Sequence, residues 1–145
     1  MRLRQLERQN EIVNVLRFLS EVDPEILKGD VFEQDPQSDA YFVDLSGIQL
    51  SGISIDIIEA EGLRLSGATF DNSTFHHFSC TRCGFSGGTF KNVDFTQVSL
   101  VGSDFTGANF LGSNIDEVDL DGAIFDAAIW SDGRKCSEQS RGACK

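Results

Sequence analysis

The sequence has few of the residues from which enzymes build catalytic sites. Its 145 residues include one tyrosine, one tryptophan, one methionine and two histidines, and the two histidines are neighbours, His76 and His77. No serine, threonine or cysteine nucleophile has an identifiable base partner to activate it. We therefore expect a protein that is not an enzyme, has no catalytic residues and needs no cofactor.

Long apolar runs are also absent. No stretch approaches the roughly 20 apolar residues that a membrane-spanning helix requires. Arg2 and Arg4 could begin a signal peptide, but the residues from Gln5 to Glu11 supply no apolar core for one. The sequence thus predicts a soluble protein with no membrane span in this chain.

What the sequence does contain is an apolar period of five. All eighteen residues at multiples of five from Leu45 to Trp130 are apolar, and the positions two residues earlier are all apolar or small. Glycine or asparagine follows two residues after eleven of the eighteen, which favours a recurring turn. This period fits neither a helix nor a flat strand and predicts a solenoid. The expected core ladder consists of Leu45, Leu50, Ile55, Leu65, Phe70, Phe75, Phe85, Phe90, Phe95, Leu100, Phe105, Phe110, Ile115, Leu120, Phe125 and Trp130.

These repeats resemble those of a known family. The segments 103–107 (SDFTG), 108–112 (ANFLG) and 118–122 (VDLDG) are similar to the A(D/N)LxG consensus of pentapeptide-repeat proteins, and the register runs unbroken through residues 43–132. The resemblance implies an all-β solenoid, a right-handed quadrilateral β-helix of about four and a half coils. Its central and minus-two side chains would fill the interior. Large centres such as Phe90 stand beside small partners such as Gly88, as a shared close-packed core requires.

Residues 1–42 follow a different pattern. Apolar residues recur at helical spacing up to about Glu21, and a second short helix is expected from Asp23 to Gly29. We expect an N-terminal α-helical cap that covers the open end of the solenoid. The alternative is a short coiled coil with Asn10 in its core, which would make a homodimer through the N-terminal helix. The predicted organisation is therefore 1–42 as cap, 43–132 as β-helix and 133–145 as a C-terminal capping tail.

The segment 76–83 (HHFSCTRC) resembles a zinc motif, but its register argues against one. Cys80 and Cys83 occupy the two inward positions of the repeat, whereas His76 and His77 occupy outward positions. Four ligands cannot converge through the wall of a coil. We expect no metal site, with Cys80 and Cys83 as buried thiols that act as small apolar side chains.

The tail carries two further cysteines, Cys136 and Cys144. It resembles the C-terminal extension of a subset of bacterial pentapeptide-repeat proteins, which implies a bacterial source. The seven residues between these cysteines permit a disulfide in an oxidising compartment. The default localisation is the bacterial cytoplasm. A periplasmic or other extracytoplasmic site applies if a leader or anchor was removed and the disulfide forms.

Acidic residues dominate the repeats. Residues 43–132 hold thirteen acidic and three basic side chains, a net charge of −10. Four and a half coils at a spacing of about 4.8 Å span roughly 22 Å, over which duplex DNA carries about 13 charges. Grouping by column places eight acids on two neighbouring faces, called the acidic faces: Asp56, Glu59, Glu61, Asp94, Asp116, Glu117, Asp119 and Asp121.

Two functions follow from this surface. We expect a non-enzymatic scaffold that binds a protein partner through its β-helix faces or its N-terminal helix, without direct binding of nucleic acid. The alternative comes from the resemblance, because members that protect DNA gyrase from quinolones look like duplex DNA in shape and charge. The acidic faces would then mimic DNA and protect or inhibit a nucleic-acid enzyme such as gyrase.

Overall fold

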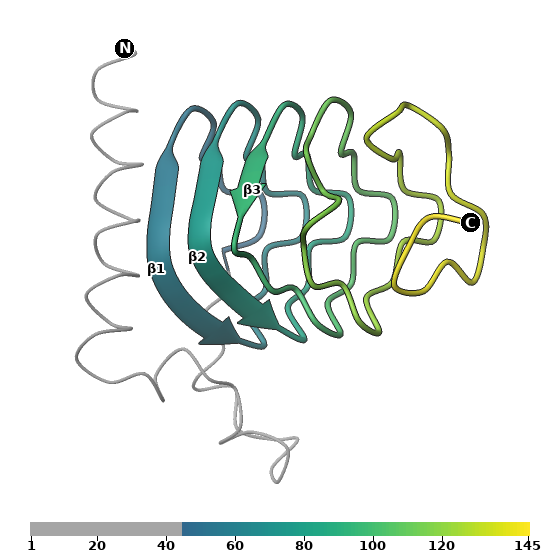
Figure 1. Ribbon diagram of the computed structural model, residues 1–145, viewed down its shortest axis with the longest axis horizontal. Coiled ribbons are helices and arrows are strands. Elements are labelled where there is room, and N and C mark those ends of the chain that lie inside the picture. Colours follow the sequence, from purple (N-terminus) through teal and green to yellow (C-terminus); the bar gives the residue numbers. More distant parts are fainter. Residues whose placement is uncertain (1–44) are drawn as a thin grey trace, which may run out of the picture.

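The computed structural model describes residues 45–145, which wind into a solenoid (Figure 1). The coils succeed one another along the long axis, from the labelled strands at one end to the C-terminal tail at the other. The predicted helical cap of residues 1–42 and the coiled coil built on it lie outside the described residues.

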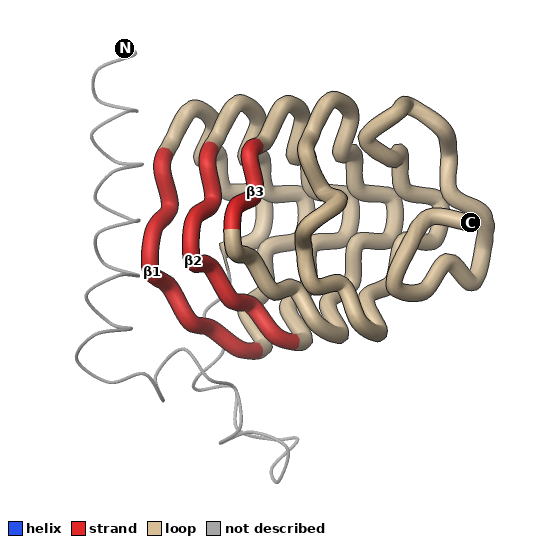
Figure 2. Tube along the Cα trace, in the orientation of Figure 1, coloured by secondary structure: helices blue, strands red, loops and turns tan. Residues whose placement is uncertain are grey.

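One wall of the solenoid is a parallel sheet of three strands in the order β1-β2-β3 (Figure 2). The strands are β1 (Ser54–Glu61), β2 (Thr74–Thr81) and β3 (Asp94–Thr96). The register pairs residues twenty apart, such as Ile55 with Phe75 and Phe75 with Phe95. Isolated parallel bridges keep the same spacing elsewhere, as far as Asn109 with Ile129. Each coil therefore takes four five-residue repeats.

Each repeat ends in a turn at its plus-two position, the second residue after the central one. From Gly47 to Ala127 every such position except Glu117 has a positive φ. The conformation is kept even where the residue is neither glycine nor asparagine, as at Ile57 (φ 53°) and His77 (φ 49°). Such angles are uncommon for these side chains. The twenty-residue pairing therefore overrides the local preference of the residue at the corner.

The interior is filled by the apolar ladder. Fourteen of its sixteen predicted residues are buried, while Leu45 and Trp130 at its two ends are partly buried and pack against the rest. Phe90 lies at its centre and stacks between Phe70 and Phe110, with ring centroids 5.1 and 5.0 Å apart. Aromatic rings of successive coils therefore form a continuous column along the axis.

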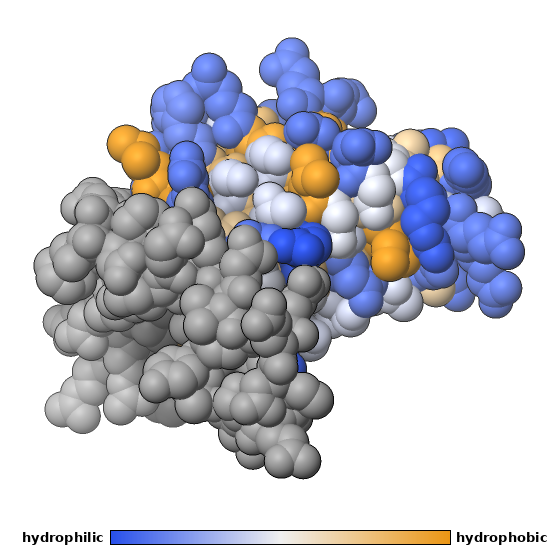
Figure 3. Space-filling view, turned by 90° about the horizontal axis from the view of Figure 1, so that it is seen from below, coloured by the Kyte–Doolittle hydropathy of each residue, from blue (hydrophilic) through white to orange (hydrophobic). Residues whose placement is uncertain are grey.

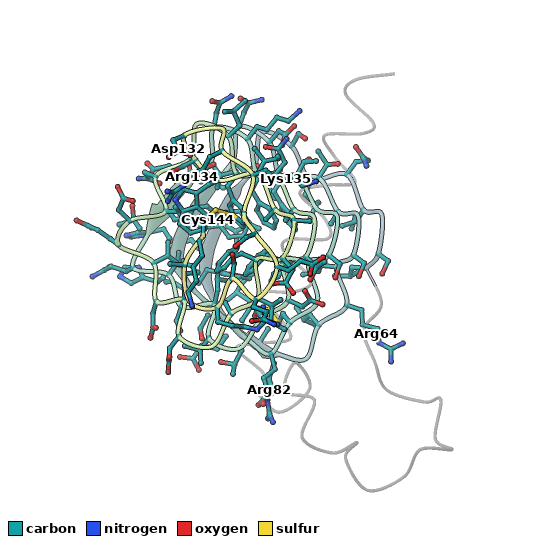
Figure 4. All side chains as sticks on the ribbon, turned by 90° about the vertical axis from the view of Figure 1, so that its right-hand side faces the viewer. Arg64, Arg82, Asp132, Arg134, Lys135 and Cys144 are labelled. Atoms are coloured by element: carbon teal, nitrogen blue, oxygen red, sulfur yellow. A yellow bond between two sulfur atoms is a disulfide. The ribbon has the colours of Figure 1, made fainter. Side chains whose placement is uncertain are left out.

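The C-terminal tail closes the far end of the solenoid. It reverses the chain direction, since Arg141 pairs with Ile124 and Lys135 with Ile129 in antiparallel bridges. Trp130 packs edge-on against Phe125, with centroids 5.1 Å apart. Figure 4 looks onto this end and shows the tail crossing it, with Asp132, Arg134, Lys135 and Cys144 labelled. The tail thus supplies the hydrogen bonds that a further coil would otherwise provide.

Residues 45–145 include no helix with the length and apolar character needed to cross a membrane. In the view of Figure 3 their surface is mostly hydrophilic, with apolar residues scattered singly among the polar ones. Ile57 and Leu111 are the large apolar side chains that are most exposed among these residues, at 62% and 46%. Single exposed apolar residues of this kind are ordinary on a protein surface.

Candidate functional site

The structure brings all eight predicted acids to two neighbouring faces, which meet at the corner that Ile57 makes within β1. Asp56, Glu59 and Glu61 lie on β1, and Asp94 begins β3. The bridges from Asp94 to Asn114 and from Ser99 to Asp119 extend the same register into the next coil. That coil presents the remaining four members at its surface, namely Asp116, Glu117, Asp119 and Asp121.

Several members of the acidic faces already have partners. Glu61 forms an ion pair with Arg82, which follows β2 and projects outward in Figure 4. Asp94 accepts a hydrogen bond from the Asn114 amide at 2.6 Å, and Asp119 accepts the backbone amide of Asp121 at 3.2 Å. These contacts hold the side chains in place and neutralise part of the charge on these faces.

A groove lies at the corner between the two acidic faces. Its volume is about 340 Å³, and it is lined from four successive coils. Glu59 stands at one end, and Glu117 and Asp119 stand at the other. Between these ends the groove is lined by His77, Phe78, Ser79, Gln97, Val98 and Ser99. Phe78 and Val98 are themselves buried, so the groove has an apolar floor and carboxylates at both ends.

At the edge of this groove three side chains from adjacent coils meet, one of which is the groove residue His77. Asp56 pairs with His76 in the sheet register, and the His76 Nδ1 lies within hydrogen-bonding distance of Asp56 Oδ1, at 3.2 Å. His77 Nδ1 lies 3.7 Å from the same oxygen, and the two imidazole centroids are 3.9 Å apart. We call this set the His–Asp cluster. The sequence predicted no metal site, because the motif in residues 76–83 combines the outward histidines with the inward cysteines. Asp56 is twenty residues earlier and is not part of that motif.

The prediction for Cys80 and Cys83 was wrong in one respect. Both are buried inside the coil as expected, but they are joined in a disulfide and are not thiols. The inward positions that they occupy bracket a single turn, with Cα atoms 5.7 Å apart, a separation that a disulfide spans. The five-residue register places both side chains in the interior, but it does not give the distance between them across the turn.

Cys136 and Cys144 are also joined in a disulfide, within the tail that covers the end of the ladder. Both are buried, at 3% and 7% exposure. All four cysteines of the sequence are therefore disulfide-bonded. None of them presents a thiolate as a metal ligand or nucleophile, because both roles require the reduced form.

An ion pair and a backbone hydrogen bond also attach the tail to the repeats. Arg141 Nη1 donates to Asp126 Oδ1 at 2.6 Å, and the Ser140 amide donates to the same oxygen at 3.1 Å. The hydrogen bond from Arg141 lowers the pKa of Asp126 from its ordinary value of 3.8, against a smaller opposing effect of desolvation. The charge of Arg141 and the backbone amides of Ser140 and Gln139 act in the same direction as the bond.

Buried serines have a role that the sequence did not reveal. Ser73, Ser103 and Ser113 are interior residues of the minus-two type, and each hydroxyl bridges a turn in the preceding coil. The Ser73 hydroxyl accepts the amide of Ile53 at 3.2 Å and donates to the carbonyl of Leu50 at 3.0 Å. The same arrangement joins Ser103 to Cys83 and Cys80, and Ser113 to Val93 and Phe90. A serine twenty residues after a turn could have signalled this.

Comparison with known proteins identifies the repeat. Eight copies of the pentapeptide repeat, as described by the model of that family, match residues 64–100 and 89–126. Among curated protein sequences, none is significantly similar to the chain.

Solved structures of the same kind share the fold. HetL, a pentapeptide repeat protein involved in heterocyst differentiation regulation from the cyanobacterium Nostoc, has a TM-score of 0.57 at 19% identity over 59% of this chain. The match covers 36% of HetL, so the chain spans about a third of that protein. QnrB1, a plasmid-mediated fluoroquinolone resistance protein, has a TM-score of 0.42 at 22% identity, over 56% of this chain and 46% of QnrB1. The likeness to HetL, at 19% identity, concerns the fold alone.

Proposed function

Since this chain is a pentapeptide-repeat protein with carboxylates gathered on two neighbouring faces, we propose that it is a non-enzymatic scaffold that binds a protein partner through these acidic faces. The groove between Glu59 and the pair Glu117 and Asp119 is the observation that carries the proposal. Carboxylates at both ends and an apolar floor suit a segment with basic side chains on an extended backbone.

The length of the groove suggests the spacing of those basic residues. Glu59 and Asp119 occupy the same register position three coils apart, which corresponds to roughly 14 Å at about 4.8 Å per coil. An extended peptide rises about 3.3 Å per residue, so about four residues cover that span. The proposed partner therefore presents lysine or arginine residues about four positions apart in an extended segment, with apolar side chains between them.

A matched pair of triple variants tests this proposal. The groove variant carries Glu59→Gln, Glu117→Gln and Asp119→Asn. The control carries Asp71→Asn, Asp104→Asn and Asp132→Asn, which removes the same charge from other parts of the surface. Both are used with wild type as bait in a bacterial lysate, and bound proteins are quantified by mass spectrometry. A partner that is retained by wild type and the control but lost from the groove variant supports the proposal.

The N-terminal segment provides the competing interface. A variant that lacks residues 1–22 is compared in the same experiment. A partner that binds the groove variant as well as wild type, and is lost with residues 1–22, would assign binding to the predicted N-terminal helix. Equal capture by all the variants would overturn a role for either surface.

DNA mimicry is the second candidate, and the arrangement of the acids on two neighbouring faces favours it. Residues 43–132 carry a net charge of −10 over a length on which duplex DNA carries about 13 charges, and the gathering of eight acids on two neighbouring faces suits a basic DNA-binding surface. Two features weaken the resemblance to DNA. Glu61 is already paired with Arg82, and the acidic faces are interrupted by His76, His77 and Arg82. A gyrase supercoiling assay, with and without a quinolone, tests it. No effect at micromolar protein excludes gyrase as the target.

The compartment bears on the choice between these functions. Disulfides persist mainly in oxidising compartments, and this chain contains two. We therefore favour a periplasmic or other extracytoplasmic location over the cytoplasm, where gyrase acts on the chromosome. This location favours the scaffold function over mimicry of DNA.

The finer architecture is part of the same proposal. A twenty-residue register with a corner at every fifth residue supports a quadrilateral cross-section, and the handedness of the family supports a right-handed β-helix. Residues 43–132 then make four and a half coils, with residues 133–145 as one cap and residues 1–42 as a helical cap at the other end. A truncation that lacks residues 1–42 should aggregate or lose thermal stability if that cap covers the open coil.

A further inference from the structure

We propose that the His–Asp cluster of Asp56, His76 and His77 is a binding site for a divalent transition-metal ion such as Zn²⁺. The three side chains each present one ligand atom, and these atoms all lie within 4.8 Å of one another. Two imidazoles and one carboxylate are ligands that zinc accepts, with water in the remaining position. The inference does not require the proposed partner, and it shares one residue, His77, with the groove.

The corner of the coil explains how neighbouring histidines can serve one ion. Consecutive residues in a regular strand point to opposite faces. His77 has a φ of 49°, which breaks the alternation, so His76 and His77 both lie on the outer wall between the buried Phe75 and Phe78. The parallel register then sets Asp56 of the preceding coil beside His76. All three ligands are therefore held by the backbone of adjacent strands.

The distances between the ligand atoms fit a single ion. Atoms bound to zinc at about 2.0–2.1 Å in tetrahedral geometry are roughly 3.3 Å apart. Asp56 Oδ1 lies 3.2 Å from His76 Nδ1 and 3.7 Å from His77 Nδ1. Both separations are within half an ångström of that spacing. The side chains are 42% to 49% exposed, so the ion can enter from solvent and keep a coordinated water.

The sequence makes this site distinctive. His76 and His77 are the only histidines in the chain, and all four cysteines are bound in disulfides. Any zinc held by imidazole ligands of this chain must therefore use His76 or His77. The same fact simplifies the detection of zinc binding by proton NMR, because the histidine ring signals come from two residues only.

Titration of the full-length, disulfide-intact protein with Zn²⁺ tests the proposal. Calorimetry should give one saturable site, and the ring signals of His76 and His77 should change together with the same stoichiometry. Asp56→Asn, His76→Gln and His77→Gln should each weaken binding by about tenfold or more, the loss that perturbing metal-site partners commonly causes. Circular dichroism establishes that each variant remains folded.

Asp116→Asn is the matched control. Asp116 occupies the register position of Asp56 three coils later, is exposed and carries the same charge. Its replacement should leave zinc affinity unchanged. The proposal is overturned if wild type shows no saturable binding, or if the histidine and Asp56 variants bind zinc as tightly as Asp116→Asn.

Discussion

The hydroxyl of Ser103 accepts a hydrogen bond from the amide of Cys83 at 3.0 Å, across the boundary between two coils. The same hydroxyl donates to the carbonyl of Cys80 at 2.8 Å, so it bridges the turn that carries the buried disulfide. Ser103 itself is fully buried. A polar side chain in the core thus provides a hydrogen-bond partner for the Cys83 amide and for the Cys80 carbonyl.

Ser103→Ala should therefore destabilise the protein by about 1–3 kcal/mol, the usual cost of leaving buried polar groups without partners. Chemical denaturation followed by circular dichroism measures the change. Ser99→Ala is the control, because Ser99 lies on the outer wall and is partly exposed. Equal stability of the two variants would show that the turn does not need the hydroxyl.

The small partner of a large core residue gives a second prediction. A Cβ at Gly88 would lie 3.1 Å from Phe90 Cε2 and 3.0 Å from the Phe85 carbonyl oxygen. Gly88→Ala should therefore overpack the interior and cost about 1–3 kcal/mol. A Cβ at Gly84 would meet no atom closer than 4.0 Å, so Gly84→Ala should be neutral or stabilise by up to about 1 kcal/mol.

Thermal unfolding of the two alanine variants, recorded side by side, checks this difference. Both glycines lie outside the left-handed region of φ, so the backbone imposes the same requirement at each. A melting temperature for Gly88→Ala at or above that of Gly84→Ala would contradict the packing argument.

The two disulfides should differ in their response to a reducing agent. Cys80 and Cys83 lie at 0% and 1% exposure with coils on both sides, whereas Cys136 and Cys144 lie in the terminal tail. Chain ends open locally at lower free energy than the core. Under native conditions a mild reductant should open the Cys136–Cys144 bond first. Alkylation followed by peptide mass spectrometry identifies the order.

Denaturant provides the reference for this experiment. In the unfolded chain both bonds should be reduced at similar rates, because neither is protected. Alkylation of Cys80 and Cys83 before the tail cysteines in the native protein would show that the coil opens more readily than the tail.

The sequence predicted the parts of this molecule that depend on the five-residue period. The period follows from burial, so it assigned Phe90 to the core and paired it with the small Gly88. The period did not predict the specific side-chain contacts between coils. These contacts join residues twenty apart, and the residue types at such positions do not follow a repeating pattern. Asp56 beside His76 and Ser103 beneath Cys83 are of this kind. The Cys80–Cys83 disulfide was not predicted, because the assignment of two residues to inward positions does not show whether their side chains are in contact.

The pair of Asp126 and Arg141 makes the attachment of the tail dependent on pH. Because Arg141 lowers the folded-state pKa of Asp126 below 3.8, the folded state favours the ionised carboxylate more than the unfolded state does. The resulting stability is present above the unfolded pKa and is lost as the pH falls through the folded pKa. Arg141→Gln should therefore be less stable than wild type near neutral pH, and the gap should narrow below about pH 4.

The fluorescence of Trp130, the one tryptophan of the chain, measures this gap, because Trp130 packs against Phe125 and its amide donates to the carbonyl of Arg134 in the tail. Urea unfolding of wild type and Arg141→Gln is followed at several values from about pH 7 to about pH 3. Other carboxylates titrate in both proteins, so the difference between the two curves isolates the pair. Arg134→Gln removes an exposed pair with Asp132 and should change stability little at any pH. A gap for Arg141→Gln that stays constant across the range would mean that Arg141 acts through packing and not through the charge of Asp126.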